Sequence, residues 1–150
     1  MTTNYLLPLA DAIVDELNRQ PWSMTFTAQR KNVPTVNAAD LESVSVLVTP
    51  AESQRQRLTR NHIQDLFTFY ISIQQSVNSF DNDITDPLVN LGEEIRVHFD
   101  SGTALTSYTT VVCEDTRWAR NGEAPWLSQQ QLQQTMVFAS VVVVTFRVLR

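Results

Sequence analysis

The sequence has little cysteine, glycine or lysine, and each shortage excludes a class of protein. Cys113 is the only cysteine, so the chain cannot form an internal disulfide, and a reducing compartment is favoured. The three glycines, Gly92, Gly102 and Gly122, lie too far apart to form a loop that cradles a nucleotide phosphate. The other ten basic residues besides Lys31 are arginines, and they form no block that could follow a nucleic-acid backbone. These absences exclude a disulfide scaffold and the glycine-rich loops that bind dinucleotides or nucleoside triphosphates, and they argue against sequence-specific DNA binding.

Long apolar runs are also missing. The longest, Met136 to Ala139 and Val141 to Val144, are far too short to cross a bilayer, and the first residues lack the basic leader of a signal peptide. The formal net charge is −5. The sequence therefore predicts a soluble, intracellular protein with no membrane partner.

The composition that is present is typical of one compact domain, residues 1–150, with 43% hydrophobic and 18% charged residues. Apolar residues at spacings of three and four predict a helix over residues 4–19, which ends before Pro21. A second helix is expected from Pro87 to Phe99, with Asp86 as its N-cap and Ser101-Gly102 as its stop.

Two-residue alternation predicts strands at residues 24–29, 44–50 and 63–74, the third antiparallel to the second. Residues 105–113 read as a fourth strand, and 114–131 as a long loop. The segment 136–149 is apolar on both faces around Val141 to Val144, as in a central strand with partners on both edges. The fold class is thus α+β in the order α-β-β-β-α-β-β: a mostly antiparallel mixed sheet of about five strands, with two helices packed on one face.

Residue types that carry catalysis or bind metals are isolated in this sequence. His62, His98 and Cys113 have no neighbouring ligand or base, so a solvated histidine, a histidine on a helix flank and a buried apolar cysteine are the expected roles. Asp81, Asp83 and Asp86 lack the glycine and distal glutamate of a calcium loop, so turn and capping roles are expected. A divalent cation bound by these aspartates across a subunit boundary stays open. No catalytic residue, cofactor or metal ligand is predicted.

Arginine and tryptophan residues mark two candidate interaction surfaces. Residues 51–62 are almost devoid of apolar side chains and carry Arg55, Arg57 and Arg60, either on an exposed loop or on the outer tips of two long strands. They form a solvated segment or a docking surface for an acidic partner. The long loop carries a second set, which covers a core edge or contributes to an interface. Its members are Arg117, Trp118, Arg120 and Trp126.

This order of elements resembles the tail-terminator, or tail-completion, proteins of long-tailed bacteriophages. The likeness covers nearly the whole chain: the first helix (Leu6 to Leu17), the valine-rich strand before Pro50, the polar excursion and the aromatic strand (Phe67 to Ile73). The acidic-capped helix (Asp86 to Phe99), the tryptophan loop and the final strand (Val141 to Val148) follow in the same order.

The resemblance implies a structural virion protein without catalysis, assembled in the host cytoplasm. Such a protein forms a ring, commonly hexameric, that caps the head-proximal end of the tail tube, stops its polymerisation and joins the head. The implied partners are copies of itself, the tail-tube protein and a head-side connector, with DNA only passing through the lumen. The family supplies no functional residues that transfer position by position. The alternatives are a head-tail connector or stopper, a small enzyme using His62 or Cys113, and a ligand-binding α+β domain.

Overall fold

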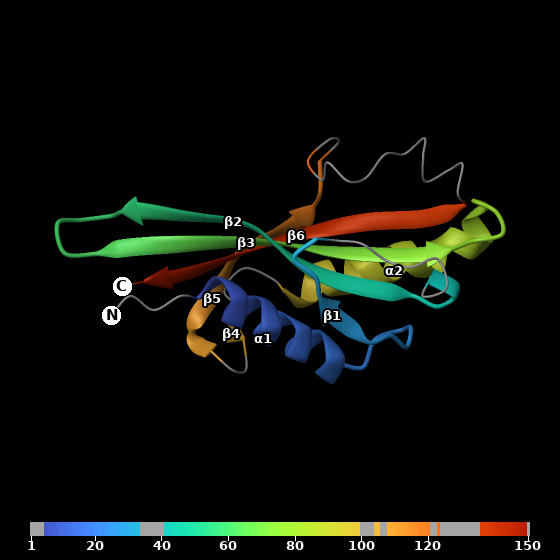
Figure 1. Ribbon diagram of the computed structural model, residues 1–150, viewed down its shortest axis with the longest axis horizontal. Helices are drawn as coiled ribbons and strands as arrows, with labels where there is room; N and C mark the ends of the chain where they lie inside the picture. The colour runs from blue at the N-terminus through green and yellow to red at the C-terminus, as the bar shows by residue number, and fades with distance from the viewer. Residues whose placement is uncertain are drawn as a thin grey trace.

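One sheet, with strand order β1-β2-β3-β6-β5-β4, carries two helices on one face (Figure 1). The computed structural model describes residues 5–33, 41–99, 104–105, 108–120, 123 and 136–149. The helices are α1 (Leu6–Arg19) and α2 (Asn82–His98). The strands are β1 (Ala28–Arg30), β2 (Ser45–Arg57), β3 (Ile63–Ser76), β4 (Ala104–Leu105), β5 (Tyr108–Trp118) and β6 (Val137–Leu149).

The α+β class and the order of the main elements are confirmed. The sheet is mixed because β1 pairs in parallel with β2, while all other pairs are antiparallel. The sixth strand, β4, has only two residues and extends the edge beside β5. It is too short to produce an alternation in the sequence, which is why five strands were expected.

The core lies between the helices and one face of the sheet. α1 packs over β1 and β2, and α2 packs over β5 and β6. Alternate residues of β3, from Phe67 to Ile73, face this core, as do Val142, Val144 and Phe146 of β6. The buried stripe of α2, Leu88, Leu91 and Ile95, meets them.

The C-terminal strand is central, as its composition predicts. β6 is paired with β3 on one edge and with β5 on the other. Val142 and Val144 belong to the main core, whereas Val141 and Val143 are buried on the opposite face with Tyr70 and Ala119 packed against them. Both faces of this strand are therefore covered.

The prediction of a strand at residues 24–29 is wrong in its bounds. The inward alternation of Trp22, Met24 and Phe26 comes from packing, because these partly buried side chains lie against the core. The Asn18 side chain exchanges two hydrogen bonds with the backbone of Ala28, at 2.7 and 3.2 Å, and so ties the chain to α1. Pairing with β2 begins only at Ala28.

The predicted start of the second helix is also wrong. α2 begins at Asn82 after Asp81, whose carbonyl accepts hydrogen bonds from the amides of Ile84 and Thr85. Asp86 is consequently inside the helix and is not its N-cap, and Pro87 lies in the second turn. Residues 82–86 look like a turn in sequence because all but Ile84 are polar, and all but the half-buried Thr85 are exposed to water. The predicted stop at Ser101-Gly102 lies outside the described residues.

The fourth predicted strand, residues 105–113, joins the end of β4 to the first part of β5 and ends too early. β5 continues through Glu114 to Trp118, which had been assigned to a loop, and Asp115 to Trp118 pair with Thr145 to Val142. The register shifts between Cys113 and Asp115, which breaks the two-residue alternation there.

Among the residues that the structure covers, no helix is both long and apolar enough to span a membrane.

Candidate functional site

The outer end of the β2–β3 hairpin projects beyond the rest of the molecule (Figure 1). Residues 51–62, called the arginine arm below, comprise the outer half of β2 and the turn before β3, and all of them are exposed. Leu58 and Thr59 close the turn by donating their amides to the His62 carbonyl, at 3.0 and 3.2 Å. Of the two readings of this segment, extended strand tips are correct for residues 51–57.

The three arginines of the arm differ in how they are held. Arg55 donates from Nε to the Asp65 carboxylate at 2.9 Å; Asp65 is buried, and this hydrogen bond raises the pKa of Arg55. Arg57 donates to the backbone carbonyl of Arg60 at 3.3 Å. Neither Arg57 nor Arg60 forms an ion pair with any described residue. Arg55 is thus held within its own subunit, whereas Arg57 and Arg60 are exposed and have no ion-pair partner among the described residues.

The second candidate set is tied to the end of β5. Arg117 binds Glu123 with two hydrogen bonds, one of them 2.6 Å between Nη1 and Oε1. The Glu123 carboxylate also accepts the amide of Arg120 at 2.8 Å. Arg117 is the main cause that lowers the pKa of Glu123 to about 2, and the Arg120 amide adds to this effect. Arg117 therefore fixes the chain that follows β5, and its charge is already compensated.

Trp118 covers the edge of the core, which settles one of its two readings. Its ring lies against Gly92 of α2, and its indole N–H donates to Glu93 Oε2 at 3.0 Å. The structure thus brings Arg117, Trp118 and the backbone of Arg120 together. This group belongs to the end of β5 and is separate in sequence from the arginine arm. Trp126 lies outside the described residues.

The residues with catalytic potential stand apart. His62 lies at the tip of the arm with Nδ1 3.0 Å from Thr59 Oγ1, and His98 contacts Glu16 at 3.0 Å between Nε2 and Oε1. Cys113 is buried, with its sulfur 3.2 Å from the Phe99 carbonyl. Within the described ranges, no three His, Cys, Asp or Glu side chains gather in a way that could hold a metal ion.

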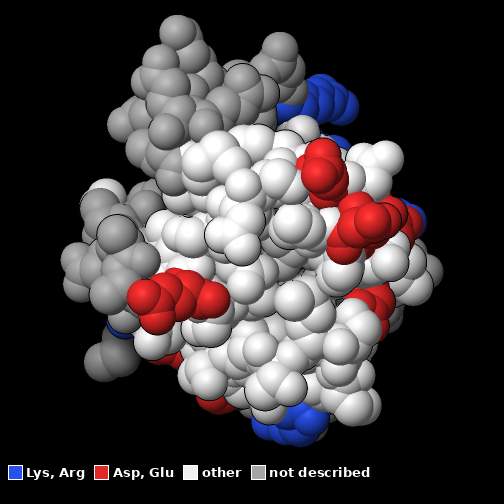
Figure 2. All heavy atoms as spheres, turned by 90° about the vertical axis from the view of Figure 1, so that its right-hand side faces the viewer, with Lys and Arg blue, Asp and Glu red and all other residues white. Residues whose placement is uncertain are grey.

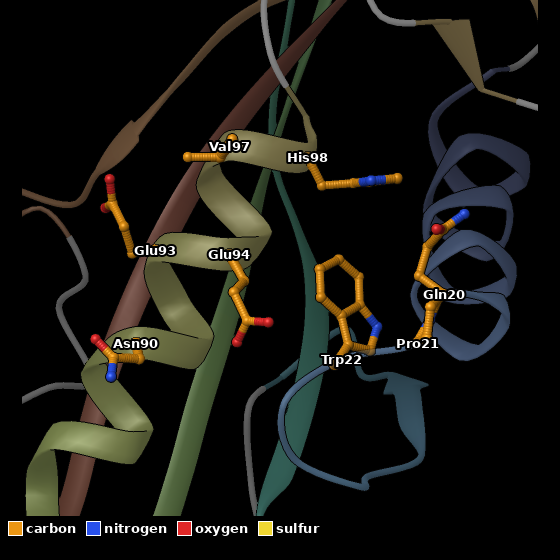
Figure 3. Close-up of a pocket in the computed structure, with 8 residues that line it drawn as sticks. All are labelled: Gln20, Pro21, Trp22, Asn90, Glu93, Glu94, Val97 and His98. Atoms are coloured by element: carbon orange, nitrogen blue, oxygen red, sulfur yellow. The ribbon is translucent and has the colours of Figure 1, made fainter.

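Sequence reasoning missed a groove of about 600 Å³ between the end of α1 and the outer face of α2 (Figure 3). Its lining residues are Gln20, Pro21, Trp22, Asn90, Glu93, Glu94, Val97 and His98. The indole N–H of Trp22 donates to the Leu17 carbonyl at 2.6 Å, and the His98 ring stands edge-on to it with centroids 5.4 Å apart. Trp22 is therefore held as a fixed wall of the groove.

The two groove carboxylates differ in their electrostatic state. Glu93 binds Arg96, which is the largest cause lowering the pKa of Glu93, and it points away from Trp22 (Figure 3). Glu94 points toward Trp22 and accepts both the amide, at 3.2 Å, and the hydroxyl of Ser23. No described cation pairs with Glu94. Among the described residues, the groove thus offers one carboxylate without a cationic partner, beside an indole.

Charge is distributed unevenly along the molecule. Figure 2 shows the end opposite the arginine arm, where separate, mostly acidic groups lie in a mainly uncharged surface. The aspartates singled out in the sequence belong to the start of α2: Asp81 is its N-cap and Asp83 lies in its first turn, where a negative charge interacts favourably with the helix dipole.

The chain matches no protein-family model and no curated protein.

Proposed function

We propose that this protein is a structural subunit of a long-tailed bacteriophage: a tail terminator that forms a ring on the head-proximal end of the tail tube. The ring stops tail polymerisation and provides the surface that joins the head. The resemblance to tail-terminator proteins in the order of elements implies six subunits. The exposed arginine arm is the observation that carries this proposal.

The arm supports an assembly role because it contributes nothing to the core of its own subunit. Every residue from Ala51 to His62 is exposed, yet the arm is a regular hairpin with strand pairing up to Arg57. Exposed strand edges invite pairing with other chains, and charged side chains on them restrict which partners bind. A ring is built from heterologous contacts, and a projecting element of this kind can reach the neighbouring subunit to make one.

The proposed partners are other copies of the chain, the tail-tube protein and a head-side connector. The net charge of −5 suits a conduit, because an acidic ring does not retain the DNA that passes through its lumen. The protein would be assembled in the bacterial cytoplasm and located in the virion, at the neck of the tail. The proposal includes no cofactor and no catalytic step.

The test is a phage in which the gene is deleted, examined by electron microscopy. Overlong tails would support termination, whereas tails of normal length that fail to join heads would favour the connector alternative. Mass spectrometry of purified virions is the companion measurement, and absence of the protein from them rejects a structural role. An enzymatic role predicts an activity that a chain with both His62→Ala and Cys113→Ala lacks.

A further inference from the structure

We propose that the tip of the arginine arm of one subunit binds the α1–α2 groove of a second copy of this chain, with Arg57 and Arg60 against Glu94 and Trp22. This inference rests on the proposed function, because it identifies the contact through which the subunits of the ring meet. The occupant of the groove is therefore a second copy of the same protein.

The tip supplies cationic groups that no described residue of the subunit neutralises. Arg57 and Arg60 are exposed, and the Arg57 side chain donates a hydrogen bond of 3.3 Å to the backbone carbonyl of Arg60 in the same turn. Arg55, by contrast, is engaged by Asp65 and belongs to the shaft of the arm. Guanidinium groups bind carboxylates in a bidentate manner and stack on aromatic rings, so the tip suits a partner that has both.

The groove supplies both. Glu94 faces it without a cationic partner among the described residues, and the ring of Trp22 forms its wall. Val97 adds an apolar surface that is 57% exposed, against which the methylene groups of an arginine can pack. The other charged groups nearby are balanced within the subunit: Glu93 binds Arg96, and Glu16 contacts both Arg19 and His98.

The position of the two surfaces makes the contact intermolecular. The tip of the arm lies at one extreme of the longest axis, whereas the end of α1 and the helix α2, whose residues line the groove, lie beyond the centre toward the other end (Figure 1). The arm extends by about six residues per strand, or about 20 Å, and it points away from the two helices (Figure 1). Contact between unlike surfaces of identical subunits is heterologous and generates a ring when the rotation closes.

Reversal of single charges on both surfaces tests the contact. Arg60→Glu and Glu94→Arg each weaken self-association by about tenfold or more, and the chain that carries both exchanges recovers it. Lys31→Glu and Glu42→Arg are the matched controls, because both residues are exposed and lie outside the two surfaces. Sedimentation velocity over a concentration series measures association, and circular dichroism confirms that each variant is folded.

Three outcomes overturn the inference: a wild-type chain that stays monomeric at every concentration, single variants that associate like their controls, or no recovery in the double exchange. The terminator proposal is judged separately by tail length. If deletion of the gene gives overlong tails but the charge exchanges leave the ring intact, only the proposed contact fails. If tails are unaffected but the exchanges behave as expected, the contact stands and the terminator proposal fails.

Discussion

Gly92 is required because the ring of Trp118 occupies the space of a side chain. A Cβ at position 92 would overlap Cη2 of Trp118 and lie 2.9 Å from Cζ3 and 3.3 Å from Cδ1 of Ile73. The hydrogen bond from Trp118 to Glu93 holds the ring in place, so it cannot move aside. Alanine favours a helix by about 1 kcal/mol over glycine, but overpacking here outweighs that gain.

We therefore expect Gly92→Ala to lower the free energy of unfolding by about 1–3 kcal/mol, as measured by urea denaturation. The same change made in a Trp118→Leu background is the control, since the smaller side chain leaves room for the new methyl group. In that background the alanine should be neutral or stabilising. An equal loss in both backgrounds would show that the indole is not the obstacle.

The ion pair between Arg117 and Glu123 makes the free energy of unfolding depend on pH in the acidic range. The folded state lowers the pKa of Glu123 from its ordinary value of 4.5 to about 2, mainly through the hydrogen bonds from Arg117. A carboxyl group with a lowered pKa adds stability that is complete above the unfolded value and is lost as the pH falls through the folded value.

Glu123→Gln should therefore lower the free energy of unfolding by about 1–2 kcal/mol at pH 7, and this difference should vanish between about pH 4.5 and pH 2. Urea denaturation at a series of pH values measures it. Arg117→Met removes the same hydrogen bonds and should flatten the same part of the wild-type profile. A constant difference between wild type and Glu123→Gln over this range would contradict the assignment.

At the level of elements, sequence pattern predicted those whose periodicity comes from one continuous core face. α1 and the inner parts of β2 and β3 are of this kind, because their alternate or stripe residues pack against a single layer. β6 was predicted from a different pattern, apolar residues on both of its faces. The end of β5 could not be predicted, since the register shift at Cys113 breaks the alternation. The start of α2 could not be predicted for another reason: its first turn faces water and therefore carries no apolar stripe.

The candidate surfaces show the same division. The arginine arm was visible in the sequence because its composition is local and contains almost nothing apolar. The groove was not, since Ser23 and Glu94 are 71 residues apart and meet only when α1 packs beside α2. Trp118 looked like a loop residue until its contact with Gly92 placed it at the core edge. Tertiary proximity carries no signal in a single sequence.

The position of Pro87 inside α2 gives a prediction at this scale. Proline has no amide hydrogen to donate to the Asp83 carbonyl, and its ring crowds that carbonyl, which costs up to about 3 kcal/mol in a helix interior. Pro87→Ala should raise the free energy of unfolding by about 1–2 kcal/mol, measured by urea denaturation. If the helix instead began at residue 87, where proline is favourable, the change would be neutral or destabilising.

At the scale of the whole molecule, the net charge opposes assembly of the subunits, whereas the charges at the proposed contact favour it. Each subunit carries −5, so copies repel one another over long distances, and added salt weakens that repulsion. The proposed contact between Arg60 and Glu94 is an attraction that added salt also weakens. The response of self-association to salt therefore shows which interaction holds the subunits together.

We expect self-association to weaken as ionic strength rises from about 0.15 M to about 1 M, where the Debye length falls from about 8 Å to about 3 Å. Over this range the long-range repulsion between subunits is already largely screened. The weakening of the ion pairs in the contact therefore determines whether self-association falls or rises with added salt. Native mass spectrometry cannot span such salt, and sedimentation velocity is the suitable measurement. The chain with Arg60→Glu alone should show a weaker response because it lacks one of the pairs. Association that strengthens with salt in the wild type would mean that apolar surface, and not the arm, joins the subunits.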